Sequence, residues 1–140
     1  MFEVMITQRR MLIAKGHPGI DAGILAGWCA LIFFLSSQST LPMPPLFPHG
    51  DKVIHAGAYA VMGVAAWRIF QHLPWPVTLH VLYSICFCSL YGVSDEWHQS
   101  FVPGRDSDVM DWLADTVGAA SAVFFMQWMK QNYSRSFTGT

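Results

Sequence analysis

Four apolar runs divide the sequence, and their lengths constrain the fold more than any other feature. The first begins near Ala22, and no charged residue occurs before Asp51; the others cover residues 53–70, about 76–93 and about 109–129. A helix that crosses a bilayer needs about 20 mainly apolar residues. The second and fourth runs reach that length only if polar residues at one end are included. The sequence therefore predicts four transmembrane helices, two of which carry polar residues into the membrane.

The composition fits a single membrane domain. Hydrophobic residues make up 53% of the 140 residues and charged residues only 12%, whereas soluble domains carry about a quarter charged residues. The short connection QHLPWP makes the second and third helices an antiparallel hairpin, and the proline-rich LPMPPLFPHG links the first two. We therefore predict an all-α integral membrane bundle, with residues 1–19 as an N-terminal segment, 20–130 as the four-helix domain and 131–140 as a polar tail.

The distribution of lysine and arginine predicts the orientation. With four spans, both termini and the hairpin share one side, which carries six of the eight Lys and Arg residues. The positive-inside rule makes this side cytoplasmic, so we expect a multi-pass protein of the inner membrane with both termini in the cytoplasm. A cleaved signal peptide is the alternative for the N-terminus, but no A-x-A site follows the apolar run. The six are Arg9, Arg10, Lys15, Arg68, Lys130 and Arg135; the other two are Lys52 and Arg105.

The three cysteines all fall within apolar runs. Cys86 and Cys88 form a C-x-C pair, Cys29 stands alone, and no histidine lies at zinc-finger spacing. We therefore expect three buried small side chains rather than a disulfide or a metal knuckle.

The start of the second run, DKVIHAGAYA, carries the first group of candidate functional residues. Asp51, His55 and Tyr59 are spaced i, i+4, i+8, so they share one face of a helix, with Lys52 close to it. The structural interpretation is a snorkelling lysine, an interfacial tyrosine and a histidine bonded to a neighbouring helix. The functional interpretation is a site, because ionisable residues within a membrane are functional candidates.

The stretch after the third run carries the second group. Asp95, His98 and Gln99 share a helix face if the third helix continues beyond the apolar run. Pro103 and Gly104 then suit the centre of a type II turn, and Arg105 follows.

An acidic stripe opens the fourth run. Asp108, Asp111 and Asp115 repeat at helical spacing and continue into Gly118 and Ala122, whose small side chains let another helix approach closely. We therefore expect the stripe to face the bundle interior. Two carboxylates one turn apart in a low dielectric need a cation, a proton or a basic partner.

Two interpretations of this stripe stay open. In the structural one, Asp111 and Asp115 pair with Lys52 and Arg105 and lock the helices together. In the functional one, the acidic and histidine side chains bind a divalent metal ion or act as acid and base, while Arg105 binds a phosphate or carboxylate. The acid-rich side argues against a nucleic-acid partner. The candidate metal ligands are His55, Asp95, Glu96, His98, Asp111 and Asp115.

Taken together, these stretches resemble the VanZ-like family of small bacterial membrane proteins. The resemblance covers about residues 33–122 and includes D-K-x-x-H-x-x-x-Y, then D-E-x-x-Q-x-F-x-P-G-R, then Asp111 and Gly118. Two positions depart from it: Asp115 stands where the family often has Asn, and Met62 where Leu is usual. The matching positions, taken as candidate catalytic residues, are Asp51, Lys52, His55, Tyr59, Asp95, Glu96, Gln99, Arg105 and Asp111.

The resemblance implies a cell-envelope protein, because the family's namesake is associated with low-level resistance to the glycopeptide teicoplanin. It implies no settled catalytic activity. We therefore expect a membrane protein that affects glycopeptide susceptibility through a polar pocket at the outer leaflet. The alternatives are an enzyme acting on a lipid-linked or phosphorylated envelope substrate, a small ion- or proton-coupled transporter, and a binding module. The expected partners are the lipid bilayer, an envelope precursor or lipopeptide, and further copies of the chain.

Overall fold

Four α-helices make up most of the described part of the chain. A computed structural model describes residues 16–39 and 48–138, except for the side chains of 134–138. Each helix contains a stretch of 19 to 25 residues that is long and apolar enough to cross a membrane. The predicted all-α four-helix membrane bundle is confirmed, while most of the expected N-terminal segment and proline-rich loop lies outside the described residues. The helices are α2 (Pro18–Ser36), α3 (Gly50–Phe70), α4 (Val77–Gln99) and α5 (Val109–Thr138).

Local sequence determines where these helices begin. The His17 ring accepts a hydrogen bond from the Gly19 amide ahead of α2. Before α3, the backbone of His49 is left-handed, with φ at 62°. Asp108 caps α5, because its carboxylate accepts the Met110 amide at 2.8 Å. Helices α3 and α5 therefore start directly at polar stretches of the sequence.

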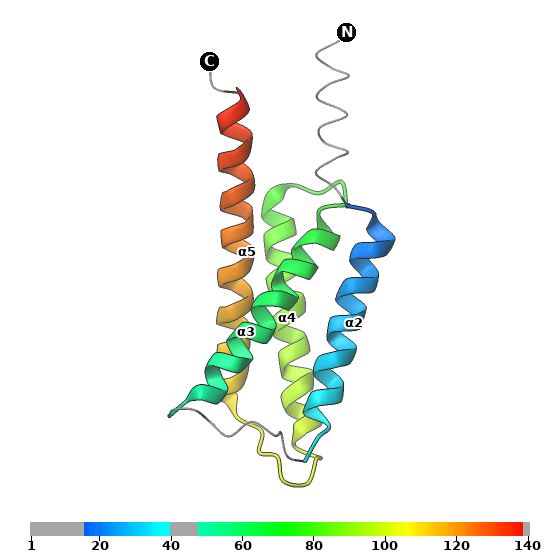
Figure 1. The fold of residues 1–140 in the computed structure, drawn as a ribbon, viewed down its shortest axis with the longest axis vertical. Helices are drawn as coiled ribbons and strands as arrows, with labels where there is room; N and C mark the ends of the chain where they lie inside the picture. Colours follow the sequence, from blue (N-terminus) through cyan, green and yellow to red (C-terminus); the bar gives the residue numbers. More distant parts are fainter. Residues whose placement is uncertain (1–15, 40–47, 139–140) are drawn as a thin grey trace.

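The helices run up and down, so that the start of α2 and the end of α5 lie at one end of the bundle (Figure 1). The connection between α3 and α4 lies at this same end, while the end of α2, the start of α3 and the α4–α5 connection lie at the other. Helix α3 packs against each of the other three helices, most extensively against α5. We call the end with the α4–α5 connection the loop end.

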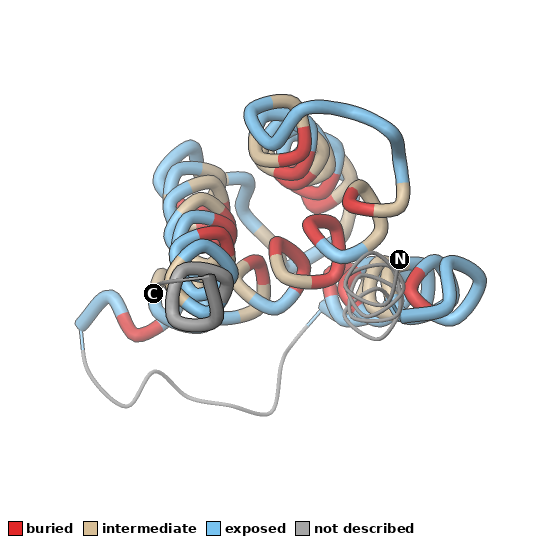
Figure 2. The backbone as a smooth tube through the Cα atoms, turned by 90° about the horizontal axis from the view of Figure 1, so that it is seen from above, coloured by how far each residue is buried: buried red, intermediate tan, exposed pale blue. Residues whose placement is uncertain are grey.

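The interior of the bundle holds many polar side chains beside its apolar core. Buried positions lie on the helix faces turned toward one another (Figure 2), and they include Asp95, Glu96, Asp111 and Asp115. Large apolar side chains such as Leu90, 70% exposed, cover the outside. This arrangement suits a bilayer, where lipid solvates the apolar exterior and polar groups find partners inside.

The three cysteines do not share one environment. Cys88 is buried and Cys29 half-buried, but Cys86 is exposed, so the expectation of three buried side chains is wrong for Cys86. Residues two apart on a helix point to opposite sides. Because Cys88 faces the bundle, Cys86 must face outward.

Candidate functional site

The predicted polar residues gather at the loop end of the bundle. The first turns of α3, the last turns of α4 and the first turns of α5 meet there. Helix α4 continues through Gln99, which carries Asp95 and Glu96 into the site. The inward orientation predicted for the acidic stripe is confirmed for two of its three members, since Asp111 is 8% exposed and Asp115 wholly buried. Asp108, whose side chain is 41% exposed, lies nearer the surface.

Lys52 lies among three carboxylates at the mouth of the site. Its Nζ is 3.1 Å from Asp51 Oδ2 and 2.7 Å from Asp111 Oδ1, and it also donates to Asp108. The hydrogen bond from Lys52 holds the pKa of Asp108 below its usual value. One cation therefore links α3 to the start of α5, and the pairing of Lys52 with Asp111 agrees with the structural interpretation of the stripe.

His55 makes the next contact, one turn deeper. Its Nδ1 is 3.0 Å from Asp115 Oδ1, and its Nε2 is 3.9 Å from Asp111 Oδ2. Asp115 is therefore partnered by His55 and not by Arg105, which corrects the structural interpretation at this residue. His55 and Asp115 pair because both lie about one helical turn further into the bundle than Lys52 and Asp111, which pair with each other nearer the loop end.

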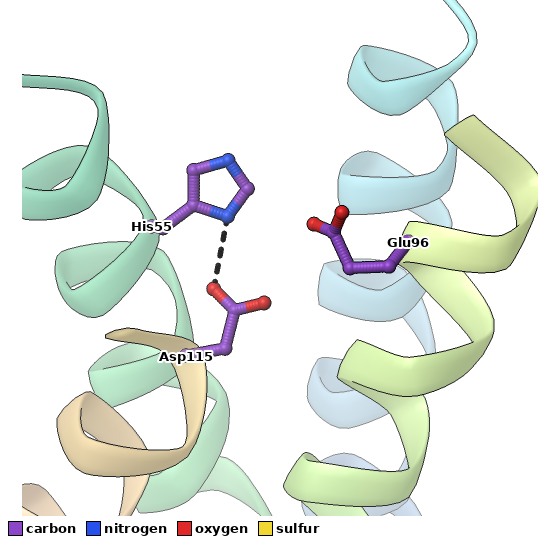
Figure 3. Close-up of side chains that lie close together, drawn as sticks. All are labelled: His55, Glu96 and Asp115. Atoms are coloured by element: carbon purple, nitrogen blue, oxygen red, sulfur yellow. Dashed lines mark hydrogen bonds and ion pairs between the residues drawn. The ribbon is translucent and has the colours of Figure 1, made fainter. Parts of the chain in front are cut away.

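Glu96 completes a group of three on the α4 side. Its Oε2 accepts the Asp108 backbone amide at 2.7 Å, and one ligand-type atom from each of His55, Glu96 and Asp115 lies within 4.8 Å of the others. The three side chains point toward one another from three helices (Figure 3). Within the described part of the chain, Glu96 Oε1 and Asp115 Oδ2 are buried without a hydrogen-bond partner.

Close helix contact brings these side chains together. A Cβ on Gly118 would overlap the backbone carbonyl of Ala56, and one on Gly63 would overlap Ala119. The backbones of α3 and α5 therefore come into close contact next to His55 and Asp115. The small-residue face of the fourth apolar run predicts this contact.

Two further candidates lie beside the group of three. Tyr59 is 1% exposed, and its hydroxyl has no hydrogen-bond partner among the described residues. Gln99 donates to Asp95 Oδ2 at 3.1 Å, and both side chains are buried. Asp95 is thus partnered within α4 and not by the residues of α3 or α5.

His98 faces away from the group of three. Its Nε2 is 3.0 Å from Ser37 Oγ, and its ring stacks on Phe33 with centroids 4.5 Å apart. It lines a cavity of about 360 Å³ between α2 and α4. The walls are mainly apolar, with Asp95 as the acidic side chain. Of the six candidate metal ligands, the structure therefore separates His98 and Asp95 from the other four.

Arg105 follows the turn that the sequence predicts. Gly104 has a φ of 83°, and the Arg105 amide donates to Val102 O at 3.1 Å, as in a type II turn. The side chain is half-buried, and its Nε is buried without a hydrogen-bond partner among the described residues. The predicted ion pair of Arg105 with the acidic stripe is not formed there.

A second buried charge cluster, at the opposite end, was not identified from the sequence. Asp21 is 2% exposed and pairs with Arg68 at 2.7 Å and with His72 at 2.8 Å. The available signal was a lone acid opening an apolar run, because such an acid needs a basic partner from another helix. This cluster joins α2 to the end of α3.

The comparisons with known proteins agree with this architecture. The family model described as VanZ/LLP1 matches residues 22–130, which include most of all four helices and every candidate site residue. No curated protein and no solved structure matches the chain.

Proposed function

The chain belongs to the VanZ/LLP1 family, and we propose that it is an inner-membrane protein acting on a cell-envelope component through the polar site at its loop end. Its four apolar helices make it a multi-pass membrane protein. The proposed consequence is altered susceptibility to teicoplanin, the property of the family's namesake.

One observation carries the proposal: among the described residues, most of the buried polar atoms without a hydrogen-bond partner lie at the loop end, and Glu96 and Asp115, which hold two of them, point toward each other there (Figure 3). A site that served only to lock helices together would leave few such atoms, because each costs about 1–3 kcal/mol. The excess of Lys and Arg in the two terminal segments of the sequence and at the end of α3 supports an outward-facing site.

The chemistry of the loop end favours an anionic, lipid-linked ligand. Arg105 offers a half-buried guanidinium with no ion pair to a described residue, and guanidinium groups suit phosphate and carboxylate. The cavity between α2 and α4 is lined by Phe33, Trp97 and Phe101, which suits an acyl or prenyl chain. An envelope precursor or a lipopeptide combines both features.

An enzyme is the second candidate, because His55 and Asp115 are hydrogen-bonded. A carboxylate bonded to one ring nitrogen of histidine orients the ring and supports acid–base catalysis. Such an enzyme would act on a lipid-linked or phosphorylated envelope substrate. A binding module would not need this pair, and a proton-coupled transporter would need Asp115 to take up and release protons.

The first test measures teicoplanin susceptibility in a Gram-positive host that expresses the protein. We expect the wild type to raise tolerance and Asp111→Asn and Arg105→Ala to abolish the increase at matched membrane levels. Asp106→Asn is the control, because Asp106 is an exposed neighbour in the same loop. Equal tolerance in all variants would show that the polar site is not needed for the effect on teicoplanin susceptibility. No increase in tolerance with the wild type would refute the proposed effect itself.

A further inference from the structure

We propose that His55, Glu96 and Asp115 bind one divalent transition-metal ion, such as Zn²⁺. The side chains come from α3, α4 and α5 and point toward a common centre (Figure 3). This inference goes beyond the effect on teicoplanin, because the ion would bind whatever the site then does.

The spacing of the three side chains is close to that of a metal site. One ligand atom from each lies within 4.8 Å of the others. Zinc binds imidazole nitrogen and carboxylate oxygen at about 2.0–2.2 Å in tetrahedral geometry, so two ligands of one ion lie about 3.3–3.6 Å apart. Side-chain rotations that bring the ligand atoms about 1 Å closer together would therefore close the site without moving a helix.

The unpartnered oxygens supply an independent reason for a cation. Glu96 Oε1 and Asp115 Oδ2 have no hydrogen-bond partner in the described part of the chain. Both residues are more than nine-tenths buried. Each residue uses its other oxygen for a protein contact, Glu96 with the Asp108 amide and Asp115 with His55. A metal ion would satisfy both free oxygens at once.

The surroundings match those of known metal ligands. If His55 binds the ion through Nδ1, the ion takes the place of the proton in the His55–Asp115 hydrogen bond, and the Nε2–H faces Asp111 Oδ2, at 3.9 Å. A carboxylate in this position fixes the ring orientation of a metal-bound histidine and increases its basicity. The amide of Asp108 orients Glu96 in the same way. Lys52 forms ion pairs with Asp51, Asp108 and Asp111, so it does not neutralise Glu96 or Asp115.

The ligand types determine which ions fit. One imidazole and two carboxylates suit Zn²⁺ or Mn²⁺ better than Mg²⁺ or Ca²⁺, which prefer oxygen ligands alone. Three protein ligands leave a coordination position for water or substrate, as in catalytic zinc sites. Asp95 and His98 take no part, because Asp95 bonds to Gln99 and His98 to Ser37.

The experiment uses the full chain, purified in detergent, stripped with a chelator and titrated with Zn²⁺ by calorimetry. We expect one ion per chain in the wild type. Glu96→Gln and His55→Asn should each weaken binding at least tenfold, since even outer-shell changes cost about 10–100-fold. Co²⁺ titration should give visible absorption bands in the wild type that both variants lose.

His98→Asn is the matched control for His55→Asn, because it removes a histidine at the same end of the bundle that lies outside the site. It should bind Zn²⁺ like the wild type. Thermal unfolding without metal shows whether each variant folds, and Asp115→Asn replaces any variant that does not. Absence of stoichiometric binding in the wild type would overturn the proposal, as would unchanged affinity in Glu96→Gln. Because no antibiotic is involved, failure here is distinguishable from failure of the proposed function.

Discussion

At the residue scale, the site depends on which pairs of polar side chains are in contact. The sequence identifies the polar residues and the helix face they share, because i, i+4 spacing determines both. It does not identify their partners. Asp95 and Glu96 are neighbours in sequence, but only Glu96 joins His55 and Asp115. The reason is the rotation of about 100° between successive helical residues, which makes each contact depend on how α4 is turned in the bundle.

Lys52 gives a residue-scale prediction about stability. Lys52→Met leaves Asp51, Asp108 and Asp111 without their shared cation. Because the lysine side chain is 23% exposed, we expect a loss of about 1–3 kcal/mol, below the 3–5 kcal/mol typical of a fully buried pair. Unfolding in an SDS titration measures this loss.

The double variant Lys52→Met/Asp111→Asn separates charge from packing. It should regain part of the stability, because it removes the most buried of the three carboxylates. If the double variant is as unstable as the sum of the single variants, the lysine does not act through Asp111.

At the scale of the helices, the lengths of the apolar runs were sufficient to predict the fold. Four runs near the length of a span became four helices, and the small-residue face of the fourth run met α3 as expected. The cluster of Asp21, Arg68 and His72 was not predicted, since its members are 47 or more residues apart from Asp21 and no local pattern joins them. Such contacts depend on which helices become neighbours, and that follows only from packing the whole bundle.

Gly118 gives the prediction for the α3–α5 contact. Gly118→Ala places a Cβ against the Ala56 backbone, so the two helices must separate, at a cost of about 1–3 kcal/mol. Zn²⁺ binding should weaken as well, because His55 and Asp115 lie on these two helices.

Gly57→Ala is the control for Gly118→Ala, because a Cβ there meets nothing within 4 Å. Alanine is the better helix former, so stability should stay constant or rise slightly. The same detergent unfolding experiment measures both variants. Equal losses in the two would mean that close approach of α3 and α5 does not limit stability.

At the scale of the whole molecule, the site's role depends on the side of the membrane that it faces. In the sequence, seven of the nine acidic residues fall at the start of α3 or between the end of α4 and the first turns of α5, whereas six of the eight basic residues fall in the terminal segments or at the end of α3. Lys and Arg set topology while acidic residues contribute little. The basic residues alone therefore make the prediction that both termini are cytoplasmic and that the site faces outward.

Reporter fusions test this orientation. Alkaline phosphatase, which is active only outside the cytoplasm, should be inactive when fused after Thr140 and active when inserted into the connection between α2 and α3. Green fluorescent protein should give the reverse pattern. If the fusions instead place the C-terminus outside, the site would face the cytoplasm, and an action on outer-leaflet precursors or on teicoplanin would be ruled out. The metal site would remain, because its three ligands come together inside the bundle whichever way the bundle crosses the membrane.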